Sequence, residues 1–311
     1  MRRLIALLPI LAIALAPVAP AQETPYQPKR VNKVIELFEQ SQPAYYTGSH
    51  EGTGGGFEQG KLDAQTWADY INYDMEAAPW DVASLAEYMK GLVAGGPTKS
   101  GHRTPAVIVV LPVRGTDAAS IRANAWMVEQ VLATGVHGIL LAHATTGEAL
   151  RTLIETVRYP NSKPAAEGLG DGLRGAHGAS SAARIWGVSG REYQQKADVW
   201  PLNPEGEILI GVKIEDKYAI PHLDDIVRVP GLAFGEGGPG DMGLSLGLTS
   251  RDPEMVALQA KIFSAAKAQK LYWLGVSGND LEGSIGAGRM IGSGEKTAIA
   301  GRAFTKREMP F

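Results

Sequence analysis

Two acidic residues, Glu215 and Asp241, each follow a short apolar run. The first run covers residues 208–214, and the second, Gly231–Phe234, leads into a glycine-rich loop that ends at Asp241. Two buried strands joined by one crossover lie parallel and adjacent, so we expect both carboxylates at the same mouth of a sheet. Carboxylate oxygens are hard ligands that suit Mg²⁺ or Mn²⁺ better than zinc. The pattern therefore predicts that Glu215 and Asp241 bind a divalent cation.

The elements that would position these acids alternate along the chain as short apolar segments and helical patterns. The candidate strands are 44–47, 70–73, 106–111, 138–142, 209–214, 232–234, 271–276 and 288–291, and the candidate helices include 31–40, 82–93, 118–133, 148–157 and 253–269. This alternation is typical of a closed parallel (β/α)8 TIM barrel, which needs about 250 residues. The chain has 311 residues, and we predict one barrel domain over 31–311.

The first residues have the pattern of a secretory signal. Two arginines precede the apolar stretch Leu4–Leu15, and Ala19-Pro20-Ala21 fits a cleavage site. We therefore expect a signal peptide over 1–21, a flexible polar leader over 22–30 and export to the bacterial periplasm. Pro9 and Pro17 interrupt the first apolar run. A membrane span needs about 20 apolar residues, and no other segment is long and apolar enough, so we expect no membrane span in the mature chain.

The composition excludes several classes of function. The net charge is −3, whereas a nucleic-acid-binding protein usually carries a basic patch. The chain has no cysteine, which excludes disulfides, thiolate-bound metals and a cysteine nucleophile.

Several motifs resemble the HpcH/HpaI aldolase family, which is related to the citrate lyase β-subunit. They are V-x-I-E ending at Glu215, L-D-D-I-x-x-V-P-G over 223–231, G-P-x-D-x-x-x-S-L-G over 238–247, the turn YDMEAAP over 73–79, V-R-Y-P over 157–160, and Arg174-Gly175. The resemblance implies a TIM barrel, Mg²⁺ or Mn²⁺ on Glu215 and Asp241, and a homo-oligomer, often a hexamer. It also implies cleavage of 4-hydroxy-2-oxo acids into pyruvate, or a related 2-oxo acid, and an aldehyde. The small-molecule partners would be that oxo acid and that aldehyde.

The chain departs from the family pattern at three positions. The family's catalytic histidine corresponds to Ala77, its enolate-stabilising arginine to Leu111, and the glutamine two residues before the first metal ligand to Lys213. An unchanged family mechanism is therefore not expected.

Other side chains offer substitutes for the missing groups. Lys213 shares strand parity with Glu215, so both side chains are expected to point into the barrel, where Lys213 or Arg114 would stabilise charge. The candidate proton carriers are His143 after the fourth strand, His50 after the first strand, and His177 in the loop 161–183, because imidazole titrates near neutral pH. That long Gly-, Ala- and Ser-rich loop is expected near the active face.

The substrate is expected to lie against Gly238, Pro239 and Gly240, where glycine permits a close approach, and against Arg174. We therefore predict a metal-dependent carbon–carbon lyase of the aldolase type. Three alternatives stay open: a hydratase, decarboxylase or other lyase on the same scaffold, a Schiff-base enzyme using Lys213, and a non-catalytic periplasmic binder of oxo acids.

Overall fold

The structure, a computed structural model, describes residues 26–48, 55–162, 166–276, 281–287 and 289–311. The signal peptide expected over 1–21 lies outside the described residues, as does His50. None of the helices in the described ranges is long and apolar enough to serve as a membrane span.

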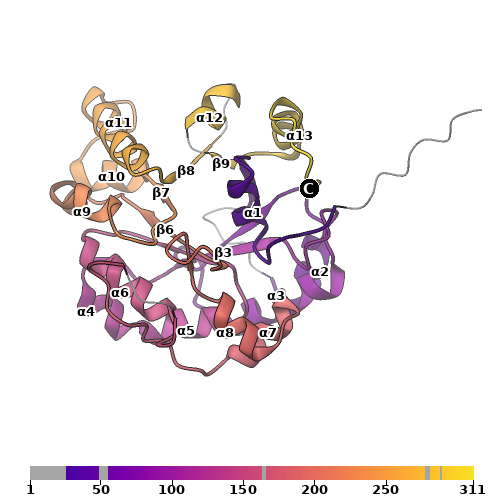
Figure 1. Ribbon diagram of the computed structural model, residues 1–311. Helices are drawn as coiled ribbons and strands as arrows, with labels where there is room; N and C mark the ends of the chain where they lie inside the picture. Colours follow the sequence, from indigo (N-terminus) through magenta and orange to yellow (C-terminus); the bar gives the residue numbers. More distant parts are fainter. Residues whose placement is uncertain (1–25, 49–54, 163–165, 277–280, 288) are drawn as a thin grey trace, which may run out of the picture.

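Eight parallel strands close into a barrel surrounded by helices, as the sequence predicts (Figure 1). They are β1 (Ala44–Thr47), β2 (Tyr70–Asp74), β3 (Ala106–Leu111), β4 (Gly138–Leu141), β6 (Ile208–Lys213), β7 (Phe234–Glu236), β8 (Tyr272–Val276) and β9 (Arg289–Gly292). Each strand pairs with its sequence neighbours, and pairing of β1 with β9 closes the ring. The two-residue strand β5 (Val199–Trp200) is an addition that pairs with the start of β6.

Helices surround the barrel, and all but the first, which precedes β1, follow a strand. They are α1 (Lys33–Glu39), α2 (Phe57–Asp63), α3 (Val82–Gly95), α4 (Ala118–Ala123), α5 (Ala125–Ala133), α6 (Gly147–Val157), α7 (Ala179–Trp186), α8 (Gly190–Lys196), the 3₁₀ helix η1 (Lys217–His222), α9 (Leu223–Val227), α10 (Pro239–Leu246), α11 (Pro253–Ala268), α12 (Leu281–Ala287) and α13 (Glu295–Phe304).

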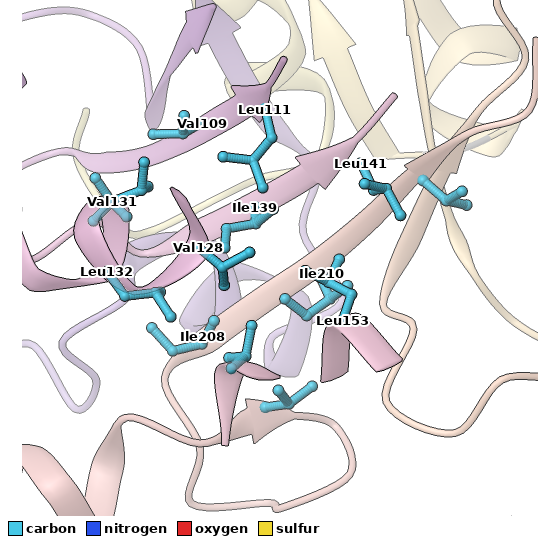
Figure 2. Packing of buried hydrophobic residues seen from close by; sticks show 14 of the residues in the cluster. Val109, Leu111, Val128, Val131, Leu132, Ile139, Leu141, Leu153, Ile208 and Ile210 are labelled. Carbon is cyan, nitrogen blue, oxygen red and sulfur yellow. The ribbon is translucent and has the colours of Figure 1, made fainter. Parts of the chain in front are cut away.

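Strand side chains alternate between two hydrophobic clusters, because successive residues of a strand point to opposite faces. One cluster lies between the strands and the helices, and it includes Val109, Leu111, Ile139 and Ile210 (Figure 2). The other cluster fills the barrel with residues such as Ile108. Leu111 therefore faces the helix layer and not the barrel interior, so it does not mark the site of a missing cavity arginine.

Helix α1 covers the end of the barrel where the strands begin. Its residues Val34 and Phe38 belong to the interior cluster. The amide of Asn32, which caps α1, donates hydrogen bonds to the backbone oxygens of His137 and Glu207, just before β4 and β6. The opposite end, where the strands finish, stays available for a site.

Two predicted elements differ in the structure. The helix expected over 118–133 is two helices, because Asn124 binds the Ser120 carbonyl with its side chain while its backbone N–H turns to Ile121. The strand expected over 232–234 is displaced to Phe234–Glu236, since Gly231 has a left-handed φ of 92° and Leu232 still belongs to a turn.

The described part of the segment 161–183, residues 161–162 and 166–183, lies at the opposite end of the barrel from the position expected for it. The Arg174 N–H donates to the Arg158 carbonyl at the end of α6, and the Trp186 indole, at the end of α7, donates to Gly135, just before β4. The segment joins a helix to the following strand, and such connections return to the amino ends of the strands. The prediction of an active-face loop is therefore wrong.

Candidate functional site

A cavity of about 440 Å³ opens at the carboxyl ends of the strands. Its lining residues are Asp74, Glu76, Ala77, Lys213, Glu215, Glu236, Gly238, Pro239, Gly240 and Asp241. The lining therefore includes five acidic residues and one lysine. In TIM barrels this face carries the active site, so the cavity is the candidate functional site.

The central pair is Lys213, the last residue of β6, and Glu215, which follows it by two residues. Both residues are buried and line the cavity, with 4% of Lys213 and 2% of Glu215 exposed. Ile208, Ile210 and Val212 of the same strand face the outer cluster. The shared parity predicted for Lys213 and Glu215 is therefore confirmed.

The turn after β2 brings a second carboxylate to Lys213. The Asp74 carboxylate accepts the backbone N–H groups of Glu76 and Ala77 at 2.7 and 3.1 Å, which fixes the turn. The Glu76 Oε2 atom then lies 2.6 Å from the Lys213 Nζ atom. Asp74 shapes the turn, and Glu76 presents its carboxylate to the cavity.

His143 stands between three acids beside the cavity. Its Nε2 atom lies 3.2 Å from Glu76 Oε1 and its Nδ1 atom 3.2 Å from Asp216 Oδ2. Its backbone N–H donates to Glu215 Oε1 at 3.0 Å. The residue has a left-handed φ of 49°, a conformation that costs energy outside glycine and is often kept at functional sites.

Asp216 orients the histidine from outside the cavity lining. Its Oδ2 atom also accepts the Arg114 guanidinium at 2.8 Å, and its Oδ1 atom accepts the Ser245 hydroxyl at 3.3 Å. The Arg114 side chain is 56% exposed. Arg114 therefore contacts the acid that holds His143, and it is not among the cavity residues.

Burial and like charge control the protonation of the central pair. Burial, reinforced by Glu76 and Glu236, raises the pKa of Glu215 to about 7, although Lys213 and the His143 N–H act in the opposite direction. For Lys213, burial acts to lower the pKa, but the hydrogen bond to Glu76 and the nearby carboxylates outweigh it and raise the pKa. Lys213 is thus held as an ammonium group.

The loop after β7 approaches Glu215 very closely at Gly238. A Cβ atom on Gly238 would lie 2.3 Å from Glu215 Oε2, whereas one on Gly240 would meet nothing within 4 Å. Glycine at position 238 therefore makes room for the carboxylate itself. Asp241 is exposed, lies in the first turn of α10 and borders the same cavity as Glu215.

The donor set fits a divalent cation. One ligand atom each from Glu76, His143 and Glu215 lie within 4.8 Å of one another. Oxygen-rich donors suit hard cations, and a buried Glu215 surrounded by other acids gains from a counter-charge. Within the described ranges, Asp241 does not belong to that close group, so its share in binding an ion stays a prediction.

Arg174 does not reach the cavity. Its side chain is buried, packs over the rings of Tyr159 and Tyr193, and donates to the Tyr193 hydroxyl at 2.9 Å. It belongs to the 161–183 segment at the other end of the barrel, so its assignment to the substrate is corrected.

Two acids of the site were missed by the sequence reasoning. Glu236 lines the cavity because β7 extends two residues beyond the predicted strand. Asp216 contacts His143 and Arg114, which precede it by more than 70 residues. The adjacency of Asp216 to Glu215 after a predicted strand was the available signal.

The comparisons with known proteins agree with this architecture. The chain is 25% identical over 187 residues to a 2-keto-3-deoxy-L-rhamnonate aldolase of Salmonella paratyphi B, which is 60% of this chain and 57% of that protein. The chain thus spans less than two thirds of the length of this curated relative. No family model matches the chain.

Solved structures show the same fold. A HpcH/HpaI aldolase/citrate lyase family protein of Burkholderia cenocepacia matches with a TM-score of 0.62 and 20% identity, over 88% of this chain and 97% of that one. A HpcH/HpaI aldolase of Desulfitobacterium hafniense matches with a TM-score of 0.58 and 20% identity, over 88% and 96%. The chain therefore has the fold of the HpcH/HpaI aldolases, and the resemblance seen in its motifs is confirmed.

Proposed function

We propose that the protein is a metal-dependent carbon–carbon lyase of the aldolase type that acts on 4-hydroxy-2-oxo acids. One observation carries the proposal: Glu215, Asp241 and the Gly238–Gly240 loop border a single acidic cavity at the carboxyl ends of the barrel strands. A curated relative is named as an aldolase for a 2-keto-3-deoxy sugar acid, which supports the same substrate class here.

The carboxylates of the cavity would hold Mg²⁺ or Mn²⁺, with Glu215 as the central ligand. When bound, such an ion polarises the 2-oxo group and stabilises the enolate formed by cleavage. The first turn of α10 lines the cavity, and its N–H groups favour the carboxylate of an oxo acid.

Lys213 would supply the positive charge that the enolate-stabilising arginine supplies in the family. Its ammonium group points into the cavity from β6 and is bound to Glu76 at 2.6 Å. A raised pKa keeps it protonated, which favours charge stabilisation and disfavours the nucleophilic amine of a Schiff-base mechanism.

Ala77 replaces the family's catalytic histidine, so other side chains would transfer the proton. Lys213 and His143 both contact Glu76. Lys213 lines the cavity and can donate a proton to a bound substrate, and His143 lies beside the cavity. Ala77 has no group with which to transfer a proton.

The test is release of pyruvate, or of a related 2-oxo acid, from 4-hydroxy-2-oxo acids, beginning with 2-keto-3-deoxy-L-rhamnonate. We expect turnover with Mg²⁺ or Mn²⁺, loss of turnover with EDTA, and recovery when the ion is restored. The Glu215→Gln variant should be inactive, and the exposed His222→Asn variant should retain activity. Turnover that is unchanged by EDTA, or no cleavage of any 4-hydroxy-2-oxo acid tested, would contradict the proposal.

A second candidate is a hydratase, a decarboxylase or another lyase on the same scaffold, or a non-catalytic oxo-acid binder. Ala77 favours it, since this exposed position carries no proton-transfer group. Product analysis after incubation with 2-oxo acids separates the enzymes from one another. Binding of oxalate with no product from any substrate would favour the binder.

We also propose export to the bacterial periplasm and assembly into a homo-oligomer, with a hexamer as one expected form. The apolar segment Leu4–Leu15 and the small-residue site after it support export. Cell fractionation tests the location, and light scattering on purified protein tests the assembly.

A further inference from the structure

We infer that His143 is a ligand of the bound ion, so that Glu76, His143 and Glu215 form a mixed nitrogen and oxygen metal site. The inference rests on the proposed function in one respect, namely that the cavity holds a divalent ion. It goes beyond that function because it places an imidazole on the ion and changes which ion the site prefers.

The three side chains lie close enough together to converge on one ion. Their donor atoms lie within 4.8 Å of one another, and His143 Nε2 is 3.2 Å from Glu76 Oε1. Neighbouring ligands at about 2.1 Å from one octahedral ion lie about 3.0 Å apart. Glu76 and His143 therefore need little movement when an ion binds, and Glu215 closes the remaining gap within the 4.8 Å group.

Each donor is already oriented by a second contact. The His143 Nδ1 atom faces Asp216 at 3.2 Å, so an N–H there leaves Nε2 directed toward Glu76 and available as an electron-pair donor. Metal-binding histidines usually donate their other ring N–H to a carboxylate in this way. Asp216 is itself held by Arg114 and Ser245.

The two glutamates are held as well. Glu76 uses Oε2 for Lys213 and presents Oε1 to His143, so contact with an ion through Oε1 preserves the ion pair. Glu215 accepts the backbone N–H of His143 itself. The left-handed backbone of His143 thus positions both the imidazole ring and the Glu215 carboxylate.

An imidazole ligand changes the ion preference. Carboxylates and water alone suit Mg²⁺, whereas imidazole strengthens binding of Mn²⁺, Fe²⁺ and Co²⁺ in that order. We therefore expect Co²⁺ to bind at least tenfold more tightly than Mg²⁺. With His143 on the ion, its Nε2 atom is not available for proton transfer.

The experiment uses the full chain and two readouts. Pulsed electron paramagnetic resonance of the Mn²⁺-loaded protein should show a nitrogen coupling typical of a bound imidazole. Calorimetric titration should show that His143→Asn reduces the affinity for Co²⁺ at least tenfold and the affinity for Mg²⁺ less than threefold. Asparagine tolerates the left-handed backbone, and thermal unfolding verifies that the variant is folded.

Two further variants sharpen the test. Asp216→Asn should weaken Co²⁺ by about tenfold, because it removes the carboxylate that orients the ring. His222→Asn changes an exposed histidine outside the cavity lining and should leave both affinities unchanged.

The outcomes separate the inference from the proposed function. The role of His143 alone is overturned if Mn²⁺ binds the unaltered protein without nitrogen coupling. It is also overturned if His143→Asn reduces the affinities for Co²⁺ and Mg²⁺ by the same factor. Failure to bind any of the three ions overturns both.

Discussion

At the scale of single residues, the site depends on one close contact between the loop after β7 and Glu215. Gly238 has φ −53°, a value open to any residue, so its backbone conformation does not require glycine. The 2.3 Å approach to Glu215 Oε2 does require it, because a methyl group there would displace the carboxylate.

Replacement of Gly238 by alanine should therefore reduce the affinity for Mn²⁺ at least tenfold, as measured by calorimetry. Gly240→Ala is the matched control, since its added Cβ meets nothing within 4 Å and its Mn²⁺ affinity should be unchanged. Equal affinities in the two variants would show that Glu215 is not held by this contact.

At the scale of elements, the start of β4 is joined to the start of β3 by a buried histidine. His137 Nδ1 accepts the Val107 N–H at 3.1 Å, which requires an unprotonated nitrogen. Burial, with a smaller contribution from His102, lowers the pKa of His137 to about 3. The folded protein therefore keeps this ring neutral, while the unfolded chain protonates it near its ordinary pKa of about 6.5.

The consequence for stability has a definite sign. The contribution of His137 is fully present above pH 6.5 and is lost as the pH falls from 6.5 toward 3, by at most about 1.4 kcal/mol per pH unit. Glu207 and Glu215 act in the opposite direction between pH 4.5 and 7, because burial raises the pKa of each to about 7.

A comparison with His137→Gln isolates the histidine from those acids. Urea unfolding at pH 7.0, 6.0 and 5.0 should show the stability advantage of the unaltered protein shrinking at each step. A difference between the two proteins that is constant with pH would refute the role given to His137.

At the scale of the whole molecule, one buried acid joins the first helix, the barrel and the end of the chain. The Asp69 carboxylate, just before β2, accepts hydrogen bonds from the two terminal guanidinium nitrogens of Arg307, and its Oδ1 atom lies 3.1 Å from Lys33 Nζ. Burial acts to raise the pKa of Asp69, but Arg307 and Lys33 outweigh it and lower the pKa. The network holds α1 and the C-terminal tail against the barrel.

Asp69→Asn should destabilise the protein by about 3–5 kcal/mol in urea unfolding, because it leaves two buried cations without their carboxylate. Glu87→Gln removes the exposed ion pair with Lys90 and should cost less than about 1 kcal/mol. Comparable losses in both variants would mean that the buried network does not hold the barrel together.

Much of this architecture was predictable because it follows from local periodicity. The alternation of apolar segments predicted all eight barrel strands, and the parity of β6 correctly placed Lys213 beside Glu215. The position of His143 directly after a strand also brought it to the site.

The remaining features depend on contacts between distant parts of the chain. Nothing local to Arg174 or to the 161–183 segment says which end of the barrel they occupy. The contacts of Asp216 with Arg114 and His143 arise only when the barrel closes. Leu111 aligns with the family's arginine because family motifs align residues by position, whereas the side-chain direction is set by strand parity.

The central claim is that acids at the barrel mouth bind a divalent ion, and calorimetric titration of Mn²⁺ tests it most directly. We expect one ion per chain in the unaltered protein, weaker binding in Asp241→Asn, and no measurable binding in a folded Glu215→Gln variant. Binding of Mn²⁺ to Glu215→Gln with unchanged affinity and stoichiometry would contradict the account.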